Sequence, residues 1–256
     1  MGCDGEVIFT RSPLYSRGRG DLRHLAHLDL SPLTLPSPPG VPGGEGLKRV
    51  YNPPVMSSRV RLDPESLLAA YAQGAFPMAD HDGVIRLYTA DPRGVMPLDD
   101  RFHVSGTLRQ LVKRPPERGG YELHINHDFE ATMRACAQQR EDGTWISEDL
   151  IQAYLRLHQF GFAHSVECWK GGELAGGLYG VSLGAAFFGE SMFHRQRDAS
   201  KVALVHLVQR LRDRGFLLLD TQATTPHLAT FGCYDVPAED YLEILSEVIA
   251  QPREFA

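Results

Sequence analysis

Two apolar stretches in the second half of the chain each end in hydrophilic residues. The first contains Glu190 and Met192, and the second, Leu217–Gln222, contains Asp220 and Gln222. Both stretches are predicted to be strands, in which side chains alternate between the two faces. Each pair, separated by two positions, is therefore expected to share a face. Hydrophilic groups at the ends of core strands commonly build a site on a rigid support.

The elements that must position these residues predict an α+β fold. Ser147 is expected to cap a helix that extends to about Gln159 and has Glu148 and Asp149 in its first turn, where the helix dipole favours acidic groups. Short glycine turns then make three strands antiparallel neighbours. A crossover helix and a parallel return strand follow. These five elements are expected at 163–169, 174–181, 185–192, Ser200–Arg214 and 216–222.

The first 140 residues divide into two segments of different composition. Residues 31–46 are mostly proline, glycine and serine, so we expect residues 1–55 to be a disordered extension and hypothesise that the native start is Met56. Residues 56–140 are predicted to form a small α/β domain, and residues 141–256 the larger catalytic domain. The elements expected in the small domain are the helix Pro64–Gln73 with Asp63 as its N-cap, the strand Ile85–Thr89, and the helices Val104–Val112 and His127–Arg140.

Composition excludes several classes of protein. A content of 43% hydrophobic residues in 256 is ample for a core. No apolar run approaches the roughly 20 residues that span a bilayer, and Asp4 and Glu6 stand where a secretory signal would be apolar. The four cysteines form no C-x-x-C pair, which argues against a zinc site and a disulfide framework. We therefore expect a cytoplasmic protein that has no membrane partner and is a monomer.

The net charge of −6 is unfavourable for extensive binding of nucleic acid, which depends on local lysine and arginine. The clearest local exception is a basic cluster of Arg109, Lys113, Arg114 and Arg118. Arg109 and Lys113 are four positions apart and are predicted to share a helix face. A solvated surface and a contact with nucleic acid both remain open for this cluster.

Five short blocks of sequence occur in an order typical of one enzyme family. They are Ala70–Pro77, Asp91–Arg93, Gly143–Ile146, Ala163–Glu167 and Phe188–Lys201. From about Leu62 to Leu245 the chain resembles the leucyl/phenylalanyl-tRNA–protein transferases. The resemblance implies that the larger domain has the fold of the GCN5-related N-acetyltransferases.

The resemblance also implies an activity. Enzymes of this family move leucine, and also phenylalanine or methionine, from charged tRNA to the N-terminal amine of an acceptor protein. The usual acceptors begin with arginine or lysine and are thereby marked for N-degron proteolysis. The reaction is aminolysis of an activated ester, and a terminal amine with a pKa of about 7.7–8.0 is partly neutral near pH 7. Because alignment of two reactants supplies roughly 7–11 kcal/mol, we expect neither a cofactor nor a covalent intermediate.

By resemblance, three residues are expected to be catalytic. Gln222 is expected to position the amine or the developing oxyanion through its amide. A carboxamide is a poor proton acceptor, so Asp220 is expected to polarise that amide or to receive a proton. Glu190 is expected to contact the α-amino group of the incoming aminoacyl moiety. From the residues alone, capping of a strand end by Asp220 and Gln222, and an ion pair between a buried Glu190 and an arginine, remain open.

Apolar and aromatic positions are expected to bind the aminoacyl-adenosine end of tRNA. The resemblance assigns a donor side-chain pocket to Leu178, Phe187, Met192, Leu204, Leu211 and Leu219. Core packing also accounts for Leu204 and Leu211, which form the apolar stripe of a core-facing helix together with Leu207 and Val208. Trp145 is implied to stack on the terminal adenine, and Tyr71 and Tyr154 match aromatic positions near the site. The basic cluster is implied to face tRNA.

The sequence departs from the family pattern at three places. Met78 stands where tryptophan is usual after Phe-Pro, and Leu87-Tyr88 replaces a Trp-Trp pair. The family's usual arginine is missing around Pro237-Ala238. These differences affect the nucleotide and acceptor ends of the site rather than the aminoacyl end.

Two other functions are compatible with the predicted fold. A coenzyme-A-dependent N-acyltransferase would need a glycine-rich loop before the crossover helix, and His194–Lys201 contains no glycine. A non-catalytic binding module is conceivable because of the replaced tryptophans. A serine hydrolase is disfavoured, because the segment around Ser191 lacks the second glycine of a G-x-S-x-G motif.

Overall fold

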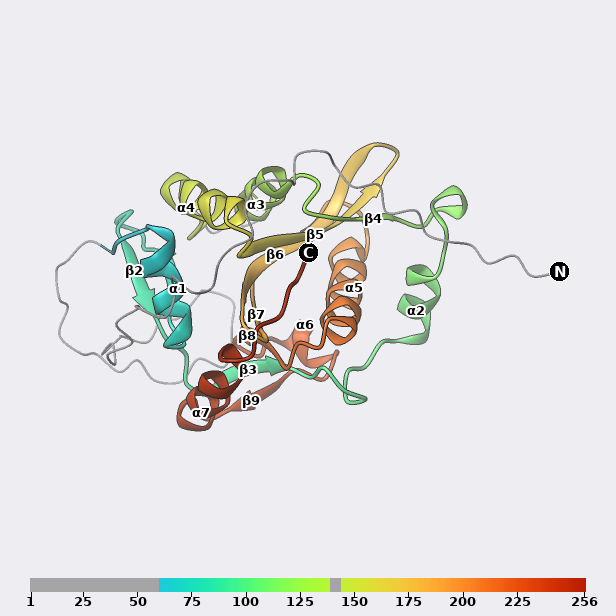
Figure 1. The fold of residues 1–256 in the computed structure, drawn as a ribbon. Helices are drawn as coiled ribbons and strands as arrows, with labels where there is room; N and C mark the ends of the chain where they lie inside the picture. Colours follow the sequence, from blue (N-terminus) through green and yellow to red (C-terminus); the bar gives the residue numbers. More distant parts are fainter. Residues whose placement is uncertain (1–59, 139–143) are drawn as a thin grey trace.

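One mixed sheet of seven strands runs through the computed structural model, which describes residues 60–138 and 144–256 (Figure 1). The strand order is β4-β5-β6-β7-β8-β3-β9, and every neighbouring pair is antiparallel except β7 and β8. A separate antiparallel pair consists of β1 (Phe76–Ala79) and β2 (Ile85–Tyr88). The strands of the large sheet are β3 (Arg93–Met96), β4 (Glu122–Ile125), β5 (Ala163–Lys170), β6 (Glu173–Leu183), β7 (Ala186–His194), β8 (Leu218–Gln222) and β9 (Tyr234–Val236).

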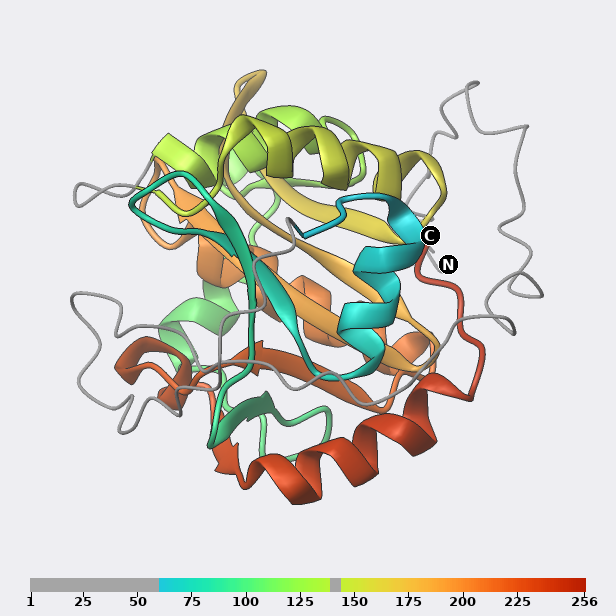
Figure 2. The ribbon, with the colours of Figure 1, turned by 90° about the vertical axis from the view of Figure 1, so that its left-hand side faces the viewer.

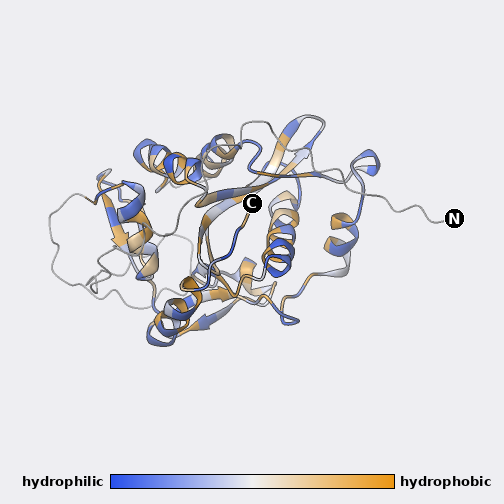
Figure 3. Cartoon of the chain, viewed as in Figure 1, coloured by the Kyte–Doolittle hydropathy of each residue, from blue (hydrophilic) through white to orange (hydrophobic). Residues whose placement is uncertain are grey.

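Helices cover both faces of this sheet. On one side, α5 packs against β5, β6 and β7, and α2 lies beside α5. On the other side, Figure 2 shows α1 in front of the sheet, with α4 above it and α7 below. The long helices have both hydrophobic and hydrophilic residues (Figure 3), as helices between a core and solvent must. The helices are α1 (Pro64–Ala72), α2 (Gly106–Val112), α3 (Phe129–Gln138), α4 (Glu148–Gln159), α5 (Ala199–Asp213), α6 (Pro226–Ala229), α7 (Ala238–Ile249) and a 3-10 turn at Pro116–Arg118.

The two faces of the sheet are buried in two separate hydrophobic clusters. The first cluster joins the sheet to α1, α3, α4 and α7, and the second joins it to α5 and α2. Neighbouring residues of one strand enter different clusters: Leu218 belongs to the first and Leu219 to the second. This alternation is the direct result of strand geometry and fixes which residues can meet at a site.

The structure confirms the expected α+β class and most of the expected elements. Asp63 caps α1 by accepting a hydrogen bond from the Ser66 backbone, and Ser147 caps α4 in the same way from Leu150. The antiparallel meander β5-β6-β7, the crossover helix α5 and the parallel return strand β8 are all present. Local caps and short turns, which are visible in sequence, determine these elements.

Several elements differ from expectation. Strands β1, β3, β4 and β9 and helices α6 and α7 were not anticipated, and the helix expected from Val104 begins at Gly106, after its cap Ser105. Strands β3 and β4 precede the expected larger domain but lie in the large sheet. The division into 56–140 and 141–256 stays a prediction. The expected disordered extension, 1–55, the hypothesised start at Met56 and the end of the helix expected to reach Arg140 lie outside the described residues.

Within residues 60–138 and 144–256, no helix combines the length and the apolar character that crossing a bilayer requires.

Gly94 provides a test of how closely β3 must approach the end of β8. A Cβ at this position would lie 2.4 Å from the backbone carbon of Ala223 and 2.6 Å from the nitrogen of Thr224. Because backbone atoms cannot move aside cheaply, we expect Gly94→Ala to lower the free energy of unfolding by about 1–3 kcal/mol in chemical denaturation. Gly106→Ala is the control, since no atom lies within 4 Å of its added Cβ. Equal stability of the two variants would contradict this close approach.

Candidate active site

Strands β7 and β8 are paired over only part of their length. Their parallel register joins Ala186 to Leu218, Phe187 to Leu219 and Phe188 to Asp220. Beyond Phe188, β7 continues beside β6 to His194, and beyond Asp220, β8 continues beside β3 to Gln222. The two strands therefore diverge inside the sheet, and the predicted catalytic residues stand on either side of the divergence.

A β-bulge in β7 coincides with the divergence. Gly180 of β6 is opposite Gly189, whereas the preceding residue Tyr179 is opposite Ser191, so Glu190 is the extra residue of the bulge. The expectation that Glu190 and Met192 share a face is wrong. Met192 packs against the second cluster, whereas Glu190 bonds to Tyr71 in the first. The extra residue reverses the alternation of the strand, which a two-residue periodicity cannot anticipate.

A hydrogen-bond network connects Glu190 to both sides of the divergence. Its Oε1 accepts a hydrogen bond of 2.8 Å from the Tyr71 hydroxyl and one of 3.0 Å from Nε2 of Gln222. The Tyr71 hydroxyl also bonds to that of Tyr154. The buried Oε2 of Glu190 has no hydrogen-bond partner among the residues that the structure describes. This oxygen is the atom of the network with capacity to bind a further donor.

Burial makes Glu190 a weak acid. Removal from water raises the pKa of this carboxyl to about 7, although the hydrogen bond from Tyr71 opposes the shift. Burial, together with the Glu190 carboxylate, also raises the pKa of the Tyr71 hydroxyl well above its usual value. Glu190 therefore changes its charge near neutral pH, while Tyr71 stays protonated, donates its single proton to Glu190 and accepts a hydrogen bond from Tyr154.

Asp220 forms a buried ion pair with Arg93. Its side chain is fully buried and that of Arg93 is 1% exposed; Nη2 of Arg93 lies 2.6 Å from Oδ2 and Nε lies 2.9 Å from Oδ1. Burial alone would lower the pKa of the guanidinium, but the Asp220 carboxylate raises it above its usual value. The Tyr241 hydroxyl donates to Oδ2 at 2.6 Å. The Arg93 guanidinium also donates to the Gly74 carbonyl and lies over the rings of Phe76 and Tyr241.

The same carboxylate fixes the backbone of Gln222. The Gln222 backbone N–H donates to Oδ1 of Asp220 at 2.7 Å, and Gln222 has a φ of 64°, in the left-handed region that non-glycine residues rarely adopt. Both oxygens of Asp220 are therefore occupied by protein donors. The side chain of Gln222 is aimed at Glu190 as a result.

The residues expected to form the donor side-chain pocket lie together in the second cluster. Five of them are buried in it and Met192 is partly buried against it; the five are Leu178, Phe187, Leu204, Leu211 and Leu219. Phe187 and Leu219 are paired neighbours one position before the last pair, Phe188 and Asp220. The apolar group therefore lies on the face of the sheet opposite to the Glu190 network.

Trp145 packs against the first cluster. Its carbonyl accepts a hydrogen bond from the Ala79 backbone at 3.1 Å, and both Trp145 and Met78 are partly buried against the first cluster. Met78, which replaces a family tryptophan, thus borders the same cluster as Trp145, which is retained. Tyr71 and Tyr154 belong to that cluster as well.

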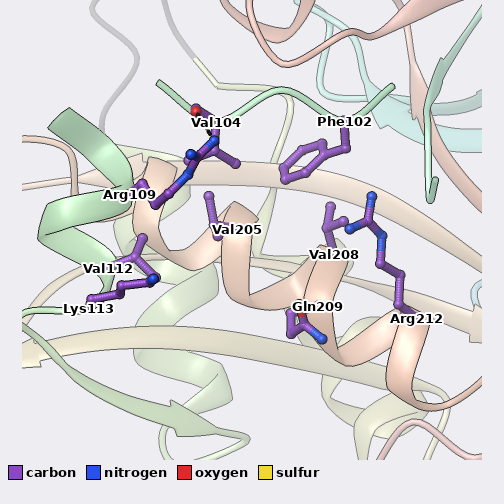
Figure 4. A pocket seen from close by; sticks show the side chains of 9 residues that line it. All are labelled: Phe102, Val104, Arg109, Val112, Lys113, Val205, Val208, Gln209 and Arg212. Carbon is purple, nitrogen blue, oxygen red and sulfur yellow. Dashed lines mark hydrogen bonds between the residues drawn. The ribbon is translucent and has the colours of Figure 1, made fainter. Parts of the chain in front are cut away.

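The basic cluster lies on the opposite side of the sheet from Trp145. Arg109 and Lys113 of α2 share a helix face, as expected, and line a cavity of about 240 Å³ between α2 and α5 (Figure 4). Val112, Val205 and Val208 form its apolar part, and Arg212 adds a third cation. All four residues of the cluster are exposed, but Arg114 and Arg118 do not line this cavity.

Sequence reasoning missed Arg93 and Tyr241. Arg93 belongs to the Asp91–Arg93 block but was given no role, and no pattern in the sequence connects it to Asp220, 127 positions away. Tyr241 lies on α7, which was not anticipated. In the described part of the chain, no group of three histidine, cysteine or acidic side chains is arranged to hold a metal ion.

Comparison with known proteins identifies clear relatives. The sequence model of the leucyl/phenylalanyl-tRNA protein transferase family matches residues 95–246, and that of the family's N-terminal domain matches residues 61–91. The leucyl/phenylalanyl-tRNA–protein transferase of Akkermansia muciniphila is 52% identical over 193 residues, which are 75% of this chain and 98% of that protein. That of Rubrobacter xylanophilus is 52% identical over 198 residues, which are 77% and 100%.

Solved structures are much less similar. The structure of L-PGS from Bacillus licheniformis has 16% sequence identity and a TM-score of 0.36, over 62% of this chain and 50% of that one. A likeness this low does not bear on the fold or the function.

The raised pKa of Glu190 predicts a pH-dependent stability. The folded pKa of about 7 exceeds the usual 4.5, so the stabilisation from proton binding is complete below 4.5 and is lost as pH rises through 7. Glu190→Gln removes this loss. We expect the variant, compared with the unsubstituted protein, to be relatively more stable at pH 8 than at pH 5 in urea denaturation. Glu243→Gln, at an exposed position of α7, is the control. The prediction would be contradicted if the stability difference between Glu190→Gln and the unsubstituted protein were the same at both pH values.

Proposed function

Because this chain belongs to the leucyl/phenylalanyl-tRNA–protein transferase family, we propose that its reaction takes place where β7 and β8 diverge. The chain is an enzyme that transfers an aminoacyl group from tRNA to a protein. The observation that supports this location is the hydrogen bond between Gln222 and Glu190 across the gap. It joins two predicted catalytic side chains from strands that do not pair at that point.

In the proposed reaction, the neutral amine of the acceptor attacks the ester carbonyl of aminoacyl-tRNA. A C–N bond forms, the C–O bond to the terminal ribose breaks, and the proton of the amine ends on the ribose oxygen. The amide of Gln222 positions the amine or the developing oxyanion. Glu190 holds the α-amino group of the donor through Oε2, the oxygen without a protein partner. An ammonium group is stabilised there when Glu190 is ionised.

Asp220 acts through Gln222 in this proposal. Its two oxygens already accept hydrogen bonds from Arg93, Tyr241 and the Gln222 backbone, so it has little capacity to receive a proton from substrate. Its contribution is to keep Gln222 in the left-handed conformation that directs the amide at Glu190. We therefore assign Asp220 a positioning role and Gln222 the direct contact.

The donor side chain is proposed to enter the apolar group around Phe187 and Leu219. This group is buried and contains no charged side chain, which favours leucine and, with sufficient depth, phenylalanine or methionine. Shape alone would discriminate against isoleucine or valine by only about 1–3 kcal/mol. Trp145 is proposed to stack on the terminal adenine, an interaction worth roughly 1–3 kcal/mol.

We also propose that the larger part of the chain has the fold of the GCN5-related N-acetyltransferases. A meander, a crossover helix and a parallel return strand that diverges from its neighbour are the features expected of the GCN5-related N-acetyltransferase type. We likewise propose that the acceptors begin with arginine or lysine and are thereby marked for N-degron proteolysis. The protein is also proposed to be cytoplasmic and monomeric. The missing arginine near Pro237 makes the acceptor the first property to measure.

The basic cluster is proposed to contact the tRNA backbone. Its four cations are exposed on one segment of a chain whose net charge is −6, so they supply local attraction that the whole protein does not. Arg109 and Lys113 share the face of α2 that borders α5. A few phosphate contacts of this kind suit an enzyme that mainly recognises the aminoacylated end of tRNA.

Gln222→Ala tests the location of the reaction. We expect kcat for transfer of leucine from leucyl-tRNA to a peptide beginning with arginine to fall on the order of 10²-fold, as when one oxyanion donor is removed. Binding of leucyl-tRNA should change little, because the amide contacts the reacting groups rather than the nucleotide. Gln152→Ala, at an exposed position of α4, is the matched control and should keep full activity.

The same assay separates the alternatives. Undiminished transfer by the Gln222 variant would remove the reaction from this site. Consumption of acetyl-CoA by the unsubstituted protein would favour an N-acyltransferase, and transfer of neither group would favour a binding module. Peptides beginning with aspartate or glutamate, tested beside arginine and lysine, measure the acceptor preference.

The salt dependence of tRNA binding tests the basic cluster. Each phosphate contact contributes roughly 0.7–0.9 to the slope of log K against log salt concentration. We expect Lys113→Ala to reduce that slope by about this amount in a fluorescence titration with leucyl-tRNA. Arg156→Ala, an exposed arginine on α4 across the sheet, should leave the slope unchanged. An unchanged slope for Lys113→Ala would mean that the cluster is a solvated surface.

A further inference from the structure

The last residues of the chain are held against the second hydrophobic cluster. Phe255 is only 2% exposed. The segment 250–256 also lies beyond residue 246, where the match to the family model ends. Its burial therefore requires a local explanation.

Three attachments hold this segment. Nε of Arg210 on α5 donates to the Phe255 carbonyl at 2.7 Å, and the guanidinium of Arg210 lies 5.0 Å from the centre of the Phe255 ring. Nε of Arg253 donates to the Gly215 carbonyl at 2.8 Å. Upstream, the Ala185 backbone N–H donates to the Val248 carbonyl at 2.9 Å. Residues 250–256 are thus fixed to α5 and to the turn that follows it, and the end of α7 is fixed to the turn that precedes β7.

The Phe255 ring is inserted between aromatic side chains. Its centre lies 4.9 Å from that of Phe187, 4.5 Å from that of His164 and 6.2 Å from that of Phe216. Burial lowers the pKa of His164 to about 3, and its Nε2 has no hydrogen-bond partner in the described residues, so the imidazole is neutral at this position. Phe255 therefore packs directly against the Phe187 ring in uncharged surroundings.

Phe187 is the residue through which this support reaches the proposed site. It pairs with Leu219 next to the divergence of β7 and β8 and belongs to the proposed donor pocket. We propose that Phe255 sets the depth of the donor pocket by holding the Phe187 ring in place, and so determines the preference between leucine and larger donor side chains. This inference rests on the function proposed above. Phe255 is a positioning residue, since it acts through Phe187.

The physical reason is the dense packing of protein interiors. Phe187 and Phe255 are both buried, so the Phe187 ring has no space to retreat while Phe255 is present. Removing the Phe255 ring leaves a cavity into which Phe187 can move. A deeper pocket loses contacts with leucine and gains room for a phenylalanine donor.

The experiment compares kcat/KM for leucyl-tRNA and phenylalanyl-tRNA with the full-length protein. We expect Phe255→Ala to raise the ratio of phenylalanine to leucine transfer about 10-fold or more, the effect of a few apolar atoms in a pocket. Phe255→Leu, which keeps a smaller apolar group in the same place, should shift the ratio in the same direction by less. If Phe255→Ala does not fold, the ratio of phenylalanine to leucine transfer measured for Phe255→Leu tests the inference.

The control is Phe129→Ala, which removes an equally buried ring on the other face of the sheet. Phe129 is 3% exposed and stacks on His158, away from Phe187. It should lower stability and reduce transfer of both amino acids alike, leaving their ratio unchanged. An unchanged ratio in folded Phe255→Leu would overturn the inference. Absence of transfer from either tRNA by the unsubstituted protein would instead overturn the proposed function.

Discussion

The buried ion pair between Arg93 and Asp220 determines the geometry of the rest of the site. It joins β3 to β8, receives the Tyr241 hydroxyl from α7, and fixes the Gln222 backbone through the same carboxylate. Burying these two charges costs much desolvation free energy, which offsets most of the attraction between them. The pair therefore contributes little to net stability and mainly fixes the geometry of the site. Both oxygens of Asp220 accept hydrogen bonds, from Arg93, Tyr241 and the Gln222 backbone, and a hydrogen-bonded network of this kind favours one arrangement. The proposed contact between Gln222 and substrate depends on that arrangement.

The divergence of β7 and β8 has two local causes, one in each strand. In β7, the bulge at Glu190 reverses the alternation of the residues that follow it, and in β8, Gln222 leaves the extended conformation at a φ of 64°. Either irregularity interrupts a ladder of hydrogen bonds, and together they prevent the strands from closing further. The hydrogen-bonding groups around Glu190 lie on the α1 side of the sheet, and the apolar group around Phe187 lies on the α5 side. In the proposed site, these two sides receive the polar α-amino group and the apolar side chain of the donor.

The sequence predicted the elements whose signals are local, and it failed where distant residues decide. Asp63 and Ser147 were found because a cap and its helix are adjacent in sequence, and the meander was found from its glycine turns. The short strands β3 and β9 contain four and three residues, and they depend on distant partners: β3 pairs with β8 and with β9, and their buried side chains pack against residues far away in sequence. The residues of the site were named from the family resemblance, but the partner of Asp220 and the face of Glu190 depend on contacts that no short pattern contains.

The strands at the two borders of the sheet are unusually short. In the part of the chain that the structure describes, β4 ends the sheet with four residues and β9 with three, and Pro237 directly follows β9. An exposed strand border invites another chain to extend the sheet, and few free peptide groups together with a proline make that extension unfavourable. The enzyme can therefore leave two central strands unpaired over part of their length without becoming prone to aggregate through its outer ones.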